Sequence, residues 1–346
     1  MNRRSSRISY VLFLAAACGG SSGGGGGGVT PAGNHTQYVI NSITAPKSQA
    51  DDAIIRVDQN SNPVETGGAP VNKLGGLIAT LKQAGNLDIQ TPLTAAVNDG
   101  SIILLSDFQT TDFTNAPGAG FSVFLGADPN PAACDGSADT TCGHQFSGSA
   151  SFSIDPNNVS NDALAGPVVS GEFTSGPGDL TIEFSLATGG SGGGAPLVIS
   201  LKDAHVKASG ITAGGMTSIT IGGAIPNSDI QTMLIPTVAD QLNATAQSEC
   251  TDEVGSAGCG SGLTEVGCTG GTNKCCSGNA GELIGSASVV ELDANGDCMI
   301  TAAELGSNSV VQGLLMPDVA TTGNGSADGV SFGIGATATG AVFTAP

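Results

Sequence analysis

Tryptophan is absent from this sequence of 346 residues, and other aromatic side chains are few, with 11 Phe and 2 Tyr. Basic residues are also scarce: 10 Lys and Arg stand against 30 Asp and Glu, which gives a formal net charge of -20. Proteins that bind nucleic acids or anionic lipid surfaces need clustered Lys and Arg. The composition therefore argues against both kinds of partner, and the lack of aromatic faces argues against a sugar-binding platform.

Glycine is abundant instead, with 54 residues, and hydrophobic residues make up 39% of the chain. The apolar share is enough to form a core. So much glycine suits short strands and many turns rather than a bundle of helices. No segment after the N-terminal region is long and apolar enough to predict a transmembrane helix.

The N-terminal region reads as an export signal. Arg3, Arg4 and Arg7 precede the apolar residues 8–17, a run that is too short to span a bilayer and fits a secretory leader. The small residues before Cys18 resemble the lipobox of bacterial lipoproteins. The resemblance implies lipidation of Cys18 and an exported protein that is anchored in the bacterial cell envelope and touches the membrane only through its lipid. The alternative is a cleaved signal followed by a spectator cysteine.

Eight further cysteines support export, because eight can form four disulfides in an oxidising compartment. They are Cys134, Cys142, Cys250, Cys259, Cys268, Cys275, Cys276 and Cys298. Zinc is the alternative, but the paired Cys-x-x-Cys spacing of zinc sites is missing and no His lies near the cluster. We expect Cys134 and Cys142 to close a small surface loop, and Cys298 to pair with one cysteine of residues 250–276.

Alternating apolar residues predict strands over much of the chain, with Gly, Pro, Asn and Asp turns between them. The strands are expected at residues 147–154, 168–173, 180–186, 197–206 and 218–221, and a strand buried on both faces at 101–108. Asn72 is expected to cap a helix over 74–81, and a helix bent at Pro236 is expected to reach about residue 246. The predicted fold is mainly β with a few helices, an α+β arrangement of antiparallel sheets forming a β-sandwich or a barrel-like structure.

Residues 293–304 carry the strongest functional signal. Side chains with oxygen atoms stand at the first, third, fifth, ninth and twelfth positions, and Ile300 at the eighth is expected to pack against a core. Calcium takes six to eight oxygen ligands, which a short loop can supply when alternate residues turn inward and a distant carboxylate closes the shell. The pattern resembles the calcium loop of EF-hands and of bacterial dockerin-like repeats.

The resemblance implies a ligand set and a local fold. The ligands are the side chains of Asp293, Asn295 and Asp297, the backbone carbonyl of Met299, Thr301 directly or through water, and both oxygens of Glu304. Cys298 stands at the sixth position, where the family usually has a Gly with positive φ, and this departure favours weak binding. The alternative is a plain polar turn before a helix.

With this resemblance the expected organisation has six parts. They are a signal peptide (1–17), a Gly/Ser-rich tether (18–33), a β-rich main domain with short helices (34–247), a Cys-rich segment held by disulfides (248–280), an EF-hand-like helix-loop-helix (281–317), and a link with a final strand that packs on the main domain (318–346). The second helix of the helix-loop-helix is expected over 302–315.

Two other patterns are weaker. Residues 58–62, with Glu65 nearby, repeat the first half of a calcium loop but are better explained as an Asx-rich turn, because no carboxylate stands at the twelfth position. Residues 189–194 contain Gly-x-Ser-x-Gly around Ser191, but no helix follows, as a nucleophile elbow would require. The three histidines lie in different predicted segments, and no phosphate-binding, dinucleotide or zinc-hydrolase motif occurs.

The sequence thus predicts a lipid-anchored, calcium-binding extracytoplasmic protein with a structural or interaction role and no recognisable catalytic motif. Calcium is the predicted ligand of the protein. The sequence does not identify a partner protein. A secreted hydrolase with an unrecognised site and a carrier of a small apolar ligand remain the alternatives.

Overall fold

The computed structural model describes residues 29–85, 90–136, 138–156, 158, 162–184, 197–240, 243, 264–267, 274–277, 292, 294–295, 299–322 and 325–344. The predicted leader and most of the Gly/Ser tether, with Cys18, lie outside these residues. So do most of the Cys-rich segment and nearly all of the helix expected before the calcium-type loop.

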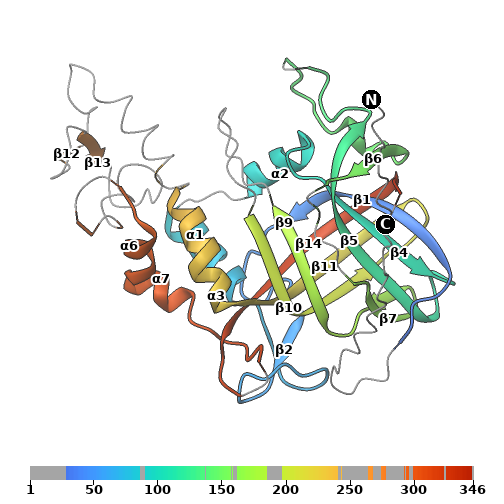
Figure 1. The fold of residues 1–346 in the computed structure, drawn as a ribbon, viewed down its shortest axis with the longest axis horizontal. Coiled ribbons are helices and arrows are strands. Elements are labelled where there is room, and N and C mark those ends of the chain that lie inside the picture. The colour runs from blue at the N-terminus through green and yellow to red at the C-terminus, as the bar shows by residue number, and fades with distance from the viewer. Residues whose placement is uncertain are drawn as a thin grey trace, which may run out of the picture.

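Ten strands form one large sheet (Figure 1). They are β1 (Asn34–Thr44), β4 (Leu104–Thr110), β5 (Ala116–Asn130), β6 (Ala150–Ile154), β7 (Leu164–Val169), β8 (Glu172–Thr174), β9 (Gly178–Phe184), β10 (Leu197–Ser209), β11 (Gly215–Pro226) and β14 (Gly329–Val342). The mainly β prediction is therefore confirmed.

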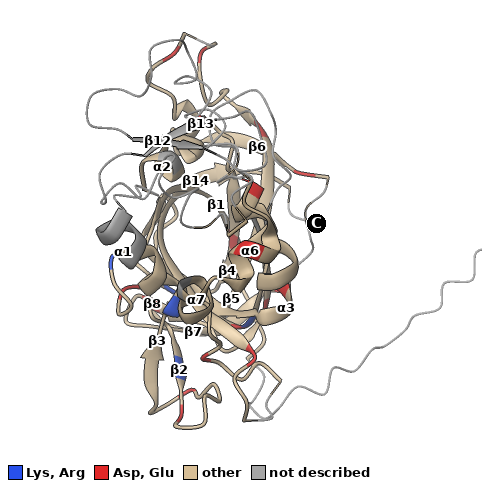
Figure 2. Ribbon diagram, turned by 90° about the vertical axis from the view of Figure 1, so that its left-hand side faces the viewer, with Lys and Arg blue, Asp and Glu red and all other residues tan. Residues whose placement is uncertain are grey.

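The sheet closes on itself. Antiparallel pairings run β1–β4–β5–β7–β8–β10–β11–β14, and β14 pairs again with β1, so that the first and last strands are neighbours. Figure 2 shows the strands encircling an interior. β9 extends β10 at one side, and β6 bridges the ends of β5 and β14, pairing in parallel with β14. Of the two forms left open by the sequence, the closed, barrel-like one is found.

Four aromatic residues pack inside the ring. Phe108, Phe121 and Phe173 are buried there together with Tyr38. The rings of Phe108 and Phe173 meet edge to face with their centroids 5.1 Å apart, a geometry that aromatic pairs prefer. Strand alternation sends these side chains inward, so side chains rather than solvent fill the middle of the sheet.

β4 is buried on both faces, as expected. Phe108 points to the interior, whereas Leu105 packs on the outside in a second cluster with Phe124, Phe152 and Phe343. β6 and the end of the chain supply the outer layer. A strand with apolar residues on both sides needs this second cover, which explains its continuous apolar pattern.

Helices gather at one end of the sheet (Figure 1). They are α1 (Lys73–Gly85), α2 (Gln90–Asn98), α3 (Asn227–Asp229) with the π-helical turn η2 (Ile230–Leu234), α6 (Ala302–Ser307) and α7 (Ser309–Leu314), besides the short 3-10 helix η1 (His144–Phe146). Asn72 caps α1 as predicted, because its Oδ1 accepts the N–H of Gly75 at 2.9 Å. The π-helical turn ends two residues before Pro236, which lacks the N–H that a regular helix would use.

Three expectations need correction or stay open. The helix expected from 302 to 315 is two helices, since Asn308 between them has extended backbone (φ -64°, ψ 126°). The Cys-rich segment, whose sequence shows little periodicity, contains the hairpin of β12 (Thr264–Gly267) and β13 (Lys274–Ser277). A further hairpin joins β2 (Ile55–Val57) to β3 (Ala69–Val71). The first helix expected for an EF-hand-like unit falls outside the described residues except for Leu292.

Candidate calcium-binding loop

Four of the six predicted calcium ligands are described: Asn295, Met299, Thr301 and Glu304. Asp293 and Asp297 lie outside the described residues, as does Cys298. The described part therefore contains the third, seventh, ninth and twelfth positions of the loop.

Thr301 and Glu304 form a capping box at the start of α6. Thr301 Oγ1 accepts the N–H of Glu304 at 3.1 Å, and Glu304 Oε2 accepts the N–H of Thr301 at 2.9 Å. Thr301 Oγ1 also lies 2.8 Å from Glu304 Oε2. These bonds give partners to backbone N–H groups at the first turn of the helix. Taken alone, they fit both a calcium loop and a plain polar turn.

A further bond joins the two ends of the loop. Glu304 Oε1 accepts the backbone N–H of Asn295 at 3.2 Å, across nine residues. Capping the helix does not require the Glu304 carboxylate to reach back to Asn295. A cation held by the third and twelfth positions requires these two residues to lie close together. The contact brings two predicted ligand residues together on an exposed side of the loop.

Ile300 anchors the loop from the other side. Its side chain is 1% exposed and belongs to the main core, together with Ile230, Ile235 and Leu305. The prediction that the eighth position packs against a core is confirmed. The loop is therefore seated on the helical segment that follows β11.

The backbone of Ile300 is paired with one side-chain amide. Its N–H donates to Asn243 Oδ1 at 2.7 Å, and its carbonyl accepts from Asn243 Nδ2 at 2.8 Å. An Asn amide offers the same donor and acceptor as a peptide group, so the pair resembles two residues that exchange both bonds in an antiparallel ladder. Nothing in the sequence pattern of residues 293–304 pointed to Asn243, which lies 57 positions away.

This pairing sets the direction of the Met299 carbonyl. In extended backbone, the N–H and C=O of one residue share a side, while the preceding C=O and the following N–H face the opposite side. Ile300 turns both of its groups to Asn243, and the next N–H, of Thr301, goes to the Glu304 carboxylate. The carbonyl of Met299 is therefore directed to the same side as Glu304, where the resemblance places the ion.

The turn at residues 58–62 has a different structure. Asp58 Oδ1 accepts the backbone N–H groups of Asn60 at 2.7 Å and of Asn62 at 3.0 Å. The side-chain amide of Asn62, followed by these backbone groups, lowers the pKa of Asp58. A carboxylate bonded within its own turn supports the preferred reading as an Asx-rich turn.

Each histidine lies beside an acidic side chain. His35 Nδ1 contacts Asp107 Oδ2, and His144 Nε2 lies 2.9 Å from Asp139 Oδ2. His205 Nδ1 is 3.0 Å from the carbonyl of Ser175, and its Nε2 is 3.9 Å from Glu65.

The ring of His144 lies in a small hydrogen-bonded loop. Asp139 also accepts the backbone N–H groups of Asp135 and Thr141, so the pair at His144 belongs to the small loop closed by Cys134 and Cys142. The Gly-rich segment around Ser191 lies outside the described residues.

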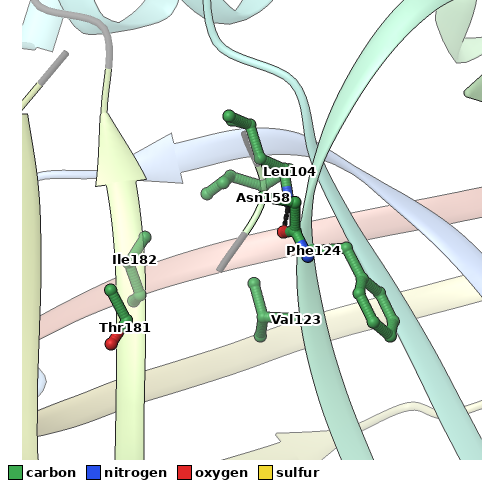
Figure 3. A pocket seen from close by; sticks show the side chains of 7 residues that line it. Leu104, Val123, Phe124, Asn158, Thr181 and Ile182 are labelled. Atoms are coloured by element: carbon green, nitrogen blue, oxygen red, sulfur yellow. Dashed lines mark hydrogen bonds between the residues drawn. The ribbon is translucent and has the colours of Figure 1, made fainter. Parts of the chain in front are cut away.

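Two pockets bear on the alternative functions. One lies between β4, β5 and β9 (Figure 3), where Asn158 Oδ1 accepts the N–H of Leu125 at 2.6 Å. Its volume of about 10 Å³ is room for about one water molecule. The other, of about 480 Å³, is open and has Asp179, Lys202 and Asp229 in its lining. Neither resembles the large apolar cavity that a carrier needs.

Cys134 and Cys142 form a disulfide with an S–S distance of 2.05 Å. This confirms the predicted surface loop and excludes zinc for these two cysteines while they are bonded to one another. The remaining predicted pairs involve residues outside the described side chains. Among the described residues, no group of three or more His, Cys, Asp or Glu side chains is arranged to hold a metal ion.

Comparisons of the chain with family models, with curated proteins and with solved structures found no match. Within the described part of the chain, no helix is long and apolar enough to cross a membrane.

Proposed function

We propose that this protein binds one calcium ion in the loop 293–304 and uses it to hold its C-terminal segment in place, in a lipid-anchored position outside the cytoplasm. The observation that carries the proposal is the bond from the Asn295 N–H to Glu304 Oε1, which closes the loop between its third and twelfth positions. The disulfide Cys134–Cys142 supports an oxidising compartment.

The described residues fit a hard cation. Met299 directs a carbonyl to the side of the Glu304 carboxylate, and Thr301 places a hydroxyl against the same group. Oxygen ligands of these kinds, completed by Asp293, Asn295 and Asp297, reach the six to eight that calcium takes. When bound, the ion supplies positive charge among three carboxylates that would otherwise repel one another.

A structural role follows from what lies after the loop. α6 and α7 lead to Asp318, whose carboxylate accepts both the backbone N–H of Ser331 at 2.8 Å and its hydroxyl at 2.6 Å. Ser331 belongs to β14 and also accepts the N–H of Lys73 at the start of α1. An ordered loop would therefore help to fix the positions of β14 and α1. Calcium here stabilises the fold, in keeping with a structural or interaction role.

Calorimetric titration of the oxidised, mature chain with calcium chloride tests the proposal. We expect one site with Kd of roughly 10⁻⁴ to 10⁻³ M, the range of extracellular calcium modules, and weaker binding of magnesium. Glu304→Gln should abolish the signal. Equal binding by the wild type and by Glu304→Gln, or no binding by the wild type, would overturn the proposal.

A further inference from the structure

We infer that Asn243 is the positioning residue of the calcium loop: its amide orients the peptide between Met299 and Ile300 so that the Met299 carbonyl faces the ion. The inference rests on the proposed function and assigns a determinant of affinity outside the twelve loop residues. Asn243 touches no ion itself and acts through its two bonds to Ile300.

The argument begins with the freedom of a peptide group. A peptide plane can rotate about the two soft torsions that flank it, which exchanges the directions of its N–H and C=O. If the plane between Met299 and Ile300 turned over, an N–H would point at the proposed ion and a carbonyl oxygen would be lost. The bond from the Ile300 N–H to Asn243 Oδ1, at 2.7 Å, holds the plane in the productive direction.

The same bond also affects the strength of the ligand. A peptide N–H that donates a hydrogen bond polarises its own carbonyl, so the oxygen of Met299 becomes a better acceptor. Outer partners that orient a metal ligand commonly change metal affinity by roughly 10- to 100-fold when they are removed. Asn243 has the geometry of such a partner.

Asn243 further ties the loop to the body of the protein. It follows the helical segment that begins at α3, and Ile230, Ile235 and Ala239 of that segment share the main core with Ile300. Movement of this segment would therefore tilt the peptide that carries the ligand. Ion binding and the packing of this segment should be linked, and each should stabilise the other.

A purely structural role makes a different prediction. The N–H and C=O of Ile300 need partners in any case, since this residue is buried. If Asn243 only satisfies them, its loss lowers stability but leaves the calcium affinity of the folded protein unchanged. If it positions the ligand, affinity falls as well.

The test compares two matched variants of the oxidised, mature chain by calorimetric titration with calcium chloride. Asn243→Leu keeps the size of the side chain and removes both bonds. Asn158→Leu is the control, because Asn158 also holds a backbone N–H, that of Leu125, away from the loop. We expect Asn243→Leu to raise Kd by about 10- to 100-fold and the control to leave Kd unchanged. Asn243→Gln, which keeps the amide, should recover part of the loss.

A second measurement needs only the wild type, so the inference stays testable if Asn243→Leu fails to fold. Carbonyl ¹³C resonances should shift on calcium addition at Met299 and much less at Ile300, whose carbonyl faces Asn243. Wild-type binding with an unchanged Kd in Asn243→Leu, or with no Met299 shift, overturns the inference while the calcium function stands. Absence of wild-type binding overturns both.

Discussion

Asn72 pairs its side-chain amide with the backbone of Gly333, 261 residues further along the chain. Asn72 Oδ1 accepts the Gly333 N–H at 3.1 Å, and Asn72 Nδ2 donates to the Gly333 carbonyl at 3.0 Å. A Cβ at position 333 would lie 2.0 Å from the carbonyl oxygen of Asp52, so only glycine allows this approach. The arrangement repeats that of Asn243 with Ile300, and both pairs hold C-terminal backbone against earlier parts of the chain.

Asn72→Ala should therefore lower the free energy of unfolding substantially. The side chain is fully buried, caps α1 through Gly75, and also bonds the carbonyl of Asp51. Loss of the cap costs about 1 kcal/mol, and a buried backbone group left unpaired costs roughly 1–3 kcal/mol. We expect a total of about 3 kcal/mol in urea unfolding, against a much smaller loss for Asn41→Ala, whose amide makes one bond to Thr337. Equal losses for the two variants would contradict this account.

Asp139 should contribute to stability against acid. Backbone N–H groups of Asp135 and Thr141, the Thr141 hydroxyl and His144 hold the pKa of Asp139 far below its usual range. A folded-state pKa below the unfolded value of about 3.9 stabilises the protein above that pH, and the contribution is lost as the pH falls toward the folded value.

A comparison of Asp139→Asn with the wild type checks the direction of this pH dependence of stability. The variant should be less stable at pH 7 and should lose less stability than the wild type between about pH 4 and pH 2. Asp135→Asn is the matched control, because Asp135 contributes only its backbone N–H to Asp139. Parallel pH profiles for wild type and Asp139→Asn would rule out the contribution.

The strand content and the cap of α1 could be predicted because their causes are local. The continuous apolar run of β4, the alternation along β10 and the Asn before residues 74–81 are visible in a short window of sequence. The closure of the sheet was not readable, since it depends on the pairing of β1 with β14, which are almost 300 residues apart. The break at Asn308 was missed because the apolar pattern runs on through both α6 and α7.

Of the candidate site, spacing alone indicated the buried Ile300, which the core confirms. The calcium ligands stay a prediction. The amide of Asn243 could not be inferred, because its partner is backbone and leaves no residue type to recognise at position 300. The pairing of Cys298 with one of the cysteines at 250–276 stays a prediction.

Lipidation of Cys18 is testable in cells. Arg3, Arg4 and Arg7, the apolar run 8–17 and the small residues before Cys18 together motivate it. Cys18→Ser should move the protein from the membrane fraction to the soluble fraction and remove an acylated N-terminal peptide from its mass spectrum. Ser22→Ala, in the tether, should leave both unchanged. An unmodified Cys18 in membrane-extracted wild-type protein would show that the leader is an ordinary cleaved signal.

Thermal melting of the oxidised protein tests whether calcium has the structural role. A ligand at about ten times its Kd adds roughly 1.4 kcal/mol to the stability of the state that binds it. For a protein of this size, this should raise Tm by roughly 3 °C. Magnesium at equal concentration should raise Tm less, because it demands a tighter octahedral shell and gives up its water reluctantly.

Two carboxylate substitutions then separate the loop from general charge effects. Glu304→Gln keeps the size of the side chain and one acceptor oxygen, which can serve the N–H of Thr301 or that of Asn295 but not both. It removes the bidentate carboxylate, so most of the calcium-dependent rise in Tm should vanish. Glu65→Gln removes one charge from an exposed residue near His205 and should leave the rise intact. If the two variants lose the rise equally, calcium acts on the net charge of -20 rather than in the loop. If the wild-type melt does not respond to calcium at all, residues 293–304 are a capped turn and the ion has no part in holding β14.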